Sequence, residues 1–284
     1  MTKSEILEKV EKDLETRGCS DSTVYNYCMH IRLYQDYFDK PADEMGEAEI
    51  RDYLHYLLKE KQLAPASVNA QNSSLRFLYI ETLDRLINIR KIPMINNTRS
   101  LPVLPTKDEL RYLFYLSGDN LRNKAIFMTI YGSGLRLSEA ANLRVDDIDS
   151  KGGRIFVRKG KGGRDRYAML PQKTLDVLRE YWTDAQPKDW LFLTKRGTKM
   201  TGEGIRDAWN AVVKRSGIPK RITVHMLRHC FATHLLNEGN NVFAIKRLLG
   251  HVRIDTTTWY LQLADSETLK LKSPLDTMKE IGNA

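Results

Sequence analysis

The sequence predicts a mainly α-helical protein of two domains. The first is a four-helix bundle, and the second is mixed but mainly helical, with a small β-hairpin or sheet. Three observations support this prediction. A chain of 284 residues suits two domains, apolar residues recur at helical spacing, and the polar, proline-containing segment NNTRSLPVLPT interrupts them. We therefore predict domains at 1–95 and 107–284, joined by a linker at 96–106.

Four helices are expected in the first domain. Gly18 ends the first helix, and Ser20 or Asp21 caps the second. Pro41 closes the second helix, and the fourth starts near Pro65. The apolar positions of the four helices are Ile6, Leu7, Val10 and Leu14; Val24, Tyr27, Ile31, Tyr34 and Phe38; Ile50, Tyr53, Leu54, Leu57 and Leu58; and Val68, Leu75, Leu78 and Ile80.

The second domain is expected to open with a helix and to contain one hairpin. Thr106 and Glu109 form a capping-box pattern, after which helical periodicity resumes. The segment 154–170 differs, because its apolar residues alternate on both sides of a Gly/Lys-rich turn. Such alternation is typical of two strands joined as a β-hairpin.

The charge distribution indicates a polyanionic partner. Lys and Arg exceed Asp and Glu by 45 to 36, and the excess lies after residue 95: the first 95 residues carry −3 and the remainder +12. A basic domain of this kind is typical of nucleic-acid binding, although a merely solubilising charge excess is the alternative.

Composition excludes several classes of protein. No apolar run approaches the roughly 18 residues of a membrane span, and the first ten residues are too polar for a secretory signal. The chain has three cysteines, an odd number without CxxC spacing: Cys19, Cys28 and Cys230. Neither a disulfide framework nor a zinc site is therefore expected. We expect a cytoplasmic protein with no metal and no cofactor.

The segment 131–143, YGSGLRLSEAANL, contains the first candidate for phosphate binding. Gly132 and Gly134 end one helix, and the next begins at about Arg136 or Ser138. Arg136 would therefore lie near a helix N-terminus, where backbone amides and a guanidinium together suit a phosphate. Glu139 is placed to hold that guanidinium, but an ordinary surface ion pair explains the same spacing.

The segment HMLRHCFATHLL places His225 and Arg228 on one face of a helix whose expected buried stripe is Leu227, Phe231 and Leu235. A phosphate between them would meet a proton carrier and a positive charge. His229 is the rival histidine, and His234 lies nearer the buried stripe. A structural role is the alternative for each histidine.

Two further segments complete the candidates. Five basic residues surround the glycines of RKGKGGRDR, residues 158–166, as in a hairpin tip that enters a DNA groove or in a solvated basic turn. In LLGHVRIDTTTWY, Gly250 is expected to end a helix, turning His251 into a loop. Asp255 is expected to cap a short helix carrying Tyr260. A phenol becomes a nucleophile only beside cations, and most helical tyrosines belong to the core.

Together and in this order, the four segments resemble the tyrosine recombinase (phage integrase) family, especially Xer-like two-domain bacterial members. The resemblance covers 106–265 well, and the first domain resembles the family's SAM-like core-binding domain more weakly. Arg164, where a lysine is common, and Trp259, beside the nucleophile, depart from the family pattern. The resemblance implies the catalytic residues Arg136, Lys161, His225, Arg228, His251 and Tyr260, the supporting residue Glu139, and the DNA-contacting residues Lys159, Arg164 and Arg166.

The resemblance also implies the chemistry. Tyr260 would attack a DNA phosphodiester to form a 3′-phosphotyrosyl bond, and Lys161 would protonate the leaving 5′-oxygen, with Lys159 as the other choice on the hairpin. The two arginines and His251 would stabilise phosphate charge, and His225 would assist proton transfer at Tyr260. Because two guanidinium groups supply the charge, no metal is needed, and exchange of one phosphoester for another needs no ATP.

The implied partners are double-stranded DNA with specific recombination sites and three further copies in a tetramer on synapsed DNA. The amphipathic segment 267–284 packs either on its own domain or on a neighbouring protomer. A type IB topoisomerase, which uses the same chemistry on one duplex, is the alternative enzyme. A catalytically silent DNA-binding relative and an RNA-binding module are the non-enzymatic alternatives.

Overall fold

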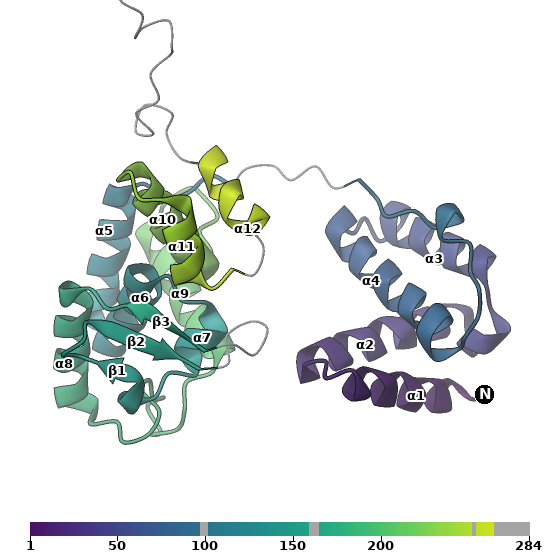
Figure 1. Ribbon diagram of the computed structural model, residues 1–284, viewed down its shortest axis with the longest axis horizontal. Helices are drawn as coiled ribbons and strands as arrows, with labels where there is room; N and C mark the ends of the chain where they lie inside the picture. Colours follow the sequence, from purple (N-terminus) through teal and green to yellow (C-terminus); the bar gives the residue numbers. More distant parts are fainter. Residues whose placement is uncertain (97–101, 159–164, 252–253, 264–284) are drawn as a thin grey trace, which may run out of the picture. The chain divides into compact units, whose positions relative to one another are not determined.

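The computed structural model describes residues 1–96, 102–158, 165–251 and 254–263. The chain divides into two compact units, Met1–Ser100 and Leu101–Ala284 (Figure 1). Each unit has its own hydrophobic core. Every helix in the described ranges is too short or too polar to span a bilayer.

The first unit contains the four helices expected from the sequence. Thr2 and Glu5 form a capping box at the start of the first, and the Ser20 side chain accepts a hydrogen bond from Thr23 N at the start of the second. Asp39 ends the second helix in the left-handed region. The elements are α1 Lys3–Thr16, α2 Asp21–Phe38, η1 Ala42–Glu44, α3 Glu47–Lys59, α4 Pro65–Phe77, the π-helical turn η2 Leu78–Thr82, and η3 Ile89–Lys91.

The core of this unit is aromatic as well as aliphatic. The fully buried hydroxyls of Tyr34 and Tyr79 lie 3.1 Å apart, and Tyr79 also donates to the Ala42 carbonyl at 2.8 Å. Tyr53 donates to the Gln71 side chain at 3.0 Å. Because these buried hydroxyls have partners, the tyrosines contribute apolar area to the bundle without an unpaired polar group.

The second unit is mainly helical around a small sheet. The Thr106–Glu109 capping box is present, as the sequence predicts. The elements are α5 Lys107–Leu116, η4 Ser117–Asp119, α6 Leu121–Ser133, α7 Leu137–Ala141, η5 Val145–Asp147, β1 Ile148–Asp149, β2 Arg154–Val157, β3 Arg166–Met169, α8 Gln172–Ala185, α9 Gly202–Ser216, α10 Val224–Asn237, α11 Val242–Leu249, α12 Asp255–Thr258 and η6 Trp259–Gln262.

The sheet is antiparallel in the order β1-β2-β3. The hairpin of β2 and β3 is the one expected from the sequence. The two-residue strand β1 pairs with β2 and is the third strand of the sheet. Ile155 pairs with Ala168, and both are buried, whereas Phe156 and Tyr167 pair on the opposite face. This alternation fixes which hairpin residues point toward the helices.

Two glycines shape the loops that lead into the site. Gly134 (φ +62°) ends α6, and Gly250 (φ +63°) ends α11, both in the left-handed region that favours glycine. A Cβ at Gly134 would lie 2.4 Å from the Phe231 ring. After the first of these turns Arg136 is the N-cap residue of α7, and after the second the chain continues to His251.

The segment around Tyr260 differs from the expectation. Asp255 is the first residue of α12 rather than its cap, because the backbone amides of Thr257 and Thr258 bond to the Ile254 carbonyl. Tyr260 lies in the following 3₁₀ turn, η6. That turn packs with α10 and α11 in a second, smaller core, which consists of Phe231, Ala232, Leu236, Ile245, Leu249 and Tyr260.

Candidate functional site

Arg228 is enclosed at the centre of the predicted constellation. Its side chain is 2% exposed. Nη1 donates to the Gly134 carbonyl at 2.6 Å, and Nη2 donates to the Leu249 carbonyl at 2.7 Å and to His251 Nε2 at 3.0 Å. Gly134 and Leu249 stand at the ends of α6 and α11, where carbonyls lack helical partners. Burial lowers the pKa of Arg228 to about 10, which leaves it charged at neutral pH.

Glu139 joins two further arginines to this centre. Its carboxylate accepts from the backbone N and Nη1 of Arg136, both at 2.7 Å, and from Nη1 and Nη2 of Arg166, both at 2.8 Å. Arg228 Nη1 lies 3.7 Å away. Burial acts to raise the pKa of Glu139, but hydrogen bonds and charge from Arg166 and Arg136 outweigh it and lower the pKa to about 2. The predicted support of Arg136 is therefore present in the geometry.

Arg166 was expected to contact DNA, yet its guanidinium is turned into the protein. Besides its two bonds to Glu139, Nε donates to the Leu248 carbonyl at 3.0 Å, and the side chain is 10% exposed. The physical reason is the burial of Glu139, whose charge needs compensation by more than one cation. Gly250 leaves room for this side chain, because a Cβ there would lie 2.8 Å from Arg166 Cδ. Arg166 thus links β3 to α7 and α11.

His251 is held in a defined protonation state. A guanidinium can only donate, so Nε2, 3.0 Å from Arg228 Nη2, must be unprotonated. Nδ1 therefore carries the proton and donates to Thr257 Oγ1 at 2.8 Å. Burial, with Arg228 and Arg136, lowers the pKa of His251 to about 3. The ring is neutral in the free protein.

The Tyr260 phenol is enclosed by the same side chains. It is 3% exposed, and its ring stacks on that of His251 with centroids 6.1 Å apart and planes 13° apart. Its Oη lies 3.0 Å from His229 Nδ1. Burial raises the pKa of Tyr260, whereas Arg228 and Arg136 act in the opposite direction. The structure therefore places a buried phenol beside a neutral base and two positive charges.

His225 lies one helical turn before His229, and their rings meet edge to face with centroids 4.9 Å apart. Although His225 has solvent-exposed surface, desolvation by the surrounding protein and the charges of Arg228 and Arg136 lower its pKa. His234, the remaining histidine of α10, bonds to the Tyr131 hydroxyl at 2.9 Å. Of these histidines, His229 is the one bonded to Tyr260.

Three predicted residues lie outside the described residues, in the part of the sequence between β2 and β3: Lys159, Lys161 and Arg164. Within the described ranges, no group of three or more His, Cys, Asp or Glu side chains has an arrangement that would hold a metal ion.

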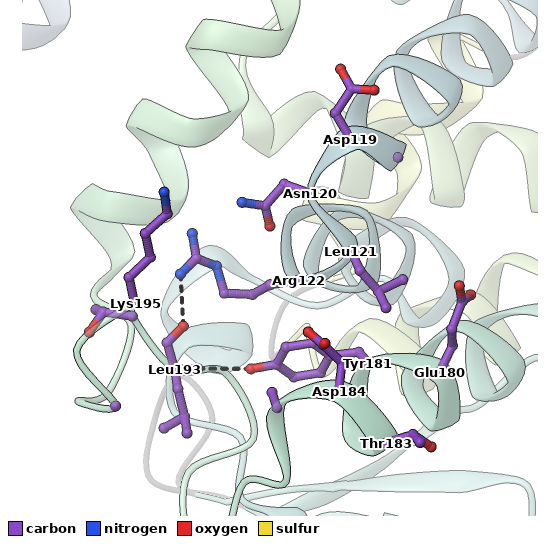
Figure 2. Close-up of a pocket in the computed structure, with 14 residues that line it drawn as sticks. Asp119, Asn120, Leu121, Arg122, Glu180, Tyr181, Thr183, Asp184, Leu193 and Lys195 are labelled. Atoms are coloured by element: carbon purple, nitrogen blue, oxygen red, sulfur yellow. Dashed lines mark hydrogen bonds between the residues drawn. The ribbon is translucent and has the colours of Figure 1, made fainter.

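A separate surface pocket of about 1060 Å³ is lined by the start of α6, the second half of α8 and residues 193–197 (Figure 2). The side chains of Arg122 and Tyr181 both point to Leu193 in Figure 2, and they bond to its carbonyl at 2.9 Å and its amide at 3.1 Å. None of the predicted site residues lines this pocket. The candidate chemistry therefore belongs to the arginine and histidine cluster.

Comparison with known proteins identifies the class. Residues 105–267 match the phage integrase family, and residues 6–89 match the phage integrase N-terminal SAM-like domain. The chain belongs to this family. It is a site-specific tyrosine recombinase that acts on DNA and catalyses strand exchange, and the predicted helical SAM-like domain and mainly helical catalytic domain are confirmed.

Individual relatives agree with this assignment. A putative integrase/recombinase of Sinorhizobium fredii, y4qK, is 36% identical over 95% of this chain and 88% of its own length. The tyrosine recombinase XerA of Pyrococcus horikoshii is 33% identical over 98% of this chain and 95% of its own length. The structure of XerH site-specific recombinase bound to palindromic difH substrate covers 95% of this chain and 83% of that one, with 22% identity and a TM-score of 0.73, which shows a shared fold.

Two contacts of the site were missed by sequence reasoning. His229 was recognised only as a rival of His225, and the four-residue spacing on one helix could not decide between them. Thr257, which orients His251, stands in a run of three threonines that gives no signal of its own. The contact of His229 joins α10 to η6, which meet only in the folded domain, whereas His251 and Thr257 lie six residues apart in one segment.

Proposed function

We propose that Tyr260 is the nucleophile of this recombinase. Its Oη attacks a DNA phosphodiester, a 3′-phosphotyrosyl bond forms, and the P–O5′ bond breaks to release a 5′-hydroxyl. The 5′-hydroxyl of a partner strand then attacks the phosphotyrosyl bond and restores the phenol. The observation that carries this proposal is the enclosure of the phenol between His229, His251 and the charge of Arg228.

The charges around the phenol support roles for their residues. Arg136 and Arg228 stabilise negative charge on the non-bridging phosphate oxygens, as preorganised donors do in other enzymes. His251 joins them once phosphate charge raises its pKa and Nε2 gains a proton, while Thr257 continues to accept from Nδ1. Lys161, on the hairpin, protonates the leaving 5′-oxygen.

The test of the nucleophile is the covalent adduct. A DNA sequence that binds the wild-type protein is first selected from random-sequence DNA. A nicked suicide duplex with this sequence as its core then traps the cleaved complex. Tyr260→Phe should bind this DNA and form no adduct, because the change removes one oxygen and little packing. Tyr131→Phe is the matched control, since it removes the hydroxyl that bonds to His234, another histidine of α10, and it should still form adduct. An adduct from Tyr260→Phe would exclude this nucleophile.

The two units are proposed to act as a DNA-binding domain, residues 1–95, and a catalytic domain, residues 107–284, joined by a linker at 96–106 that lets them grip opposite sides of a duplex. The XerH structure is described as bound to its difH substrate, which supports recognition of double-stranded recombination sites here. The three cysteines are free thiols, which suits the proposed cytoplasmic location.

The active assembly is proposed to be a tetramer on two synapsed sites. Residues 267–284 lie outside the described residues, and their apolar spacing supports docking on a neighbouring protomer. Deleting 267–284 should then leave single-site binding intact and impair synapsis and strand exchange. Gel-shift and recombination assays measure these two effects, with thermal unfolding as the control for folding. Unchanged recombination would contradict the proposed docking.

A further inference from the structure

The hydroxyl that is proposed to attack DNA has a histidine partner in the free protein, and this partner is His229 rather than His225. We propose that His229 accepts the phenolic proton of Tyr260 when Oη attacks phosphorus. This inference rests on the assignment of Tyr260 as the nucleophile. It gives a chemical role to a residue whose sequence position alone left it as an alternative.

The direction of the hydrogen bond follows from the groups around the phenol oxygen. The positive charge of Arg228 acts to lower the pKa of Tyr260, against the larger effect of burial, and such a charge attracts the lone pairs of a hydroxyl oxygen and repels its proton. The lone pairs of Oη therefore face Arg228, and its O–H is directed toward His229 Nδ1, 3.0 Å away. Nδ1 is then the unprotonated nitrogen of the imidazole, as a proton acceptor requires.

His229 is also in the right charge state. Burial, with His225 and Arg228, lowers the pKa of His229 to about 4, so the free base predominates at neutral pH. The groups whose charges act on it are His225 and Arg228 of its own helix, and Tyr260 faces it from η6. When phosphate occupies the site, its negative charge favours the protonated ring.

Packing fixes the imidazole in this position. Trp259, which departs from the family pattern, places its ring 5.3 Å from that of His229 at an interplanar angle of 63°, and 5.4 Å from that of Tyr260. On the other side, the ring of His225 meets His229 edge to face. His229 therefore has little freedom to turn Nδ1 away from the phenol.

The proton transfer balances in both half-reactions. During cleavage the Tyr260 O–H bond breaks and the His229 Nδ1–H bond forms, while Oη bonds to phosphorus and the 5′-oxygen leaves with a proton from Lys161. During rejoining the phenolate leaves phosphorus and recovers its proton from His229. Since each half-reaction restores what the other uses, no further acid or base is consumed at the tyrosine.

The decisive experiment varies the acidity of the phenol. Single-turnover adduct formation is measured on the selected suicide duplex for wild type, His229→Asn and His225→Asn, each with tyrosine or 2,3,5-trifluorotyrosine at position 260. Asn places an amide near the Nδ1 position but cannot take up a proton. A phenol that ionises near neutral pH needs no base, so only a variant lacking the proton acceptor should be rescued.

We expect His229→Asn to slow adduct formation about 100-fold or more with tyrosine, the usual scale for a lost general base. Trifluorotyrosine should reduce this defect to less than about tenfold, and it should leave any defect of His225→Asn unchanged. An equal defect with both phenols would show that His229 acts structurally and would overturn the proposal. Two other results would also overturn the proposal. One is that trifluorotyrosine rescues adduct formation only in His225→Asn, and the other is a rate for His229→Asn within about threefold of wild type.

The matched control is His234→Asn, because His234 lies on the same helix as His229 and makes the same kind of bond, outside the site, to Tyr131 of α6. It should lower the thermal midpoint about as much as His229→Asn does, yet keep adduct formation within about threefold of wild type. Failure of the nucleophile assignment itself would appear separately, as an adduct formed by Tyr260→Phe.

Discussion

Neutralising Glu139 is expected to destabilise the catalytic unit by several kcal/mol. Its side chain is 5% exposed and accepts four hydrogen bonds, two from Arg136 and two from Arg166. Glu139→Gln keeps the shape, but it replaces one acceptor by an amide that faces donors. Removing one partner from a buried ion pair typically costs about 3–5 kcal/mol.

The pKa of Glu139 gives an independent magnitude. A folded value of about 2 in place of 4.5 corresponds to about 3 kcal/mol, at ~1.4 kcal/mol per unit. Because the folded pKa is the lower one, this stabilisation is complete above the unfolded pKa of 4.5 and disappears as pH falls toward 2. By pH 3, roughly 2 kcal/mol of it should be lost.

The assay is urea unfolding followed by tryptophan fluorescence, which reports the second unit because all four tryptophans lie there. Wild type should exceed Glu139→Gln by about 3 kcal/mol at pH 7 and by roughly 1 kcal/mol at pH 3. The control is Glu238→Gln, whose partner Lys107 is equally exposed at 58%, and which should change stability by less than about 0.5 kcal/mol. A difference for Glu139→Gln that is below 1 kcal/mol at pH 7, or equal at both pH values, would refute the reasoning.

Three further predictions concern the site. Lys161→Ala should form adduct slowly on ordinary DNA and recover when sulfur replaces the leaving 5′-oxygen, because sulfur leaves without a proton; a persistent defect would place the acid elsewhere. Arg136→Ala and Arg228→Ala should each slow single-turnover cleavage about 100-fold or more, and a rate within tenfold of wild type would leave that arginine only a binding role. Gly134→Ala should lower the thermal midpoint of the tryptophan signal, because it combines φ +62° with a Cβ 2.4 Å from Phe231; an unchanged midpoint would contradict this.

Local features of the fold could be predicted from the sequence, because their signals lie within a few residues. The Thr106–Glu109 capping box, the left-handed Gly250 and the β2–β3 hairpin are all of this kind. Their chemistry depends on neighbours three or four residues away, or on strict alternation. The prediction of these features therefore required no knowledge of the tertiary structure.

Contacts between distant segments could not be predicted in the same way. Arg166 meets Glu139 across 27 residues, and His229 meets Tyr260 across 31. From the sequence alone, an arginine in a hairpin fits a DNA contact and an internal ion pair equally well. The burial of the Glu139 carboxylate, which only the structure shows, decides between the two. Geometry, rather than residue type, decides between such uses.

The hydrogen bonds of Arg228 affect which residues are replaced first when such an enzyme loses its activity through mutation. This side chain binds the terminal carbonyls of two helices, so its loss would leave two buried acceptors unpaired as well as remove charge from the site. Loss of the Tyr260 hydroxyl removes far less from the packing of the domain. Descendants that retain DNA binding after losing strand exchange should therefore keep an arginine at this position long after the tyrosine has been replaced.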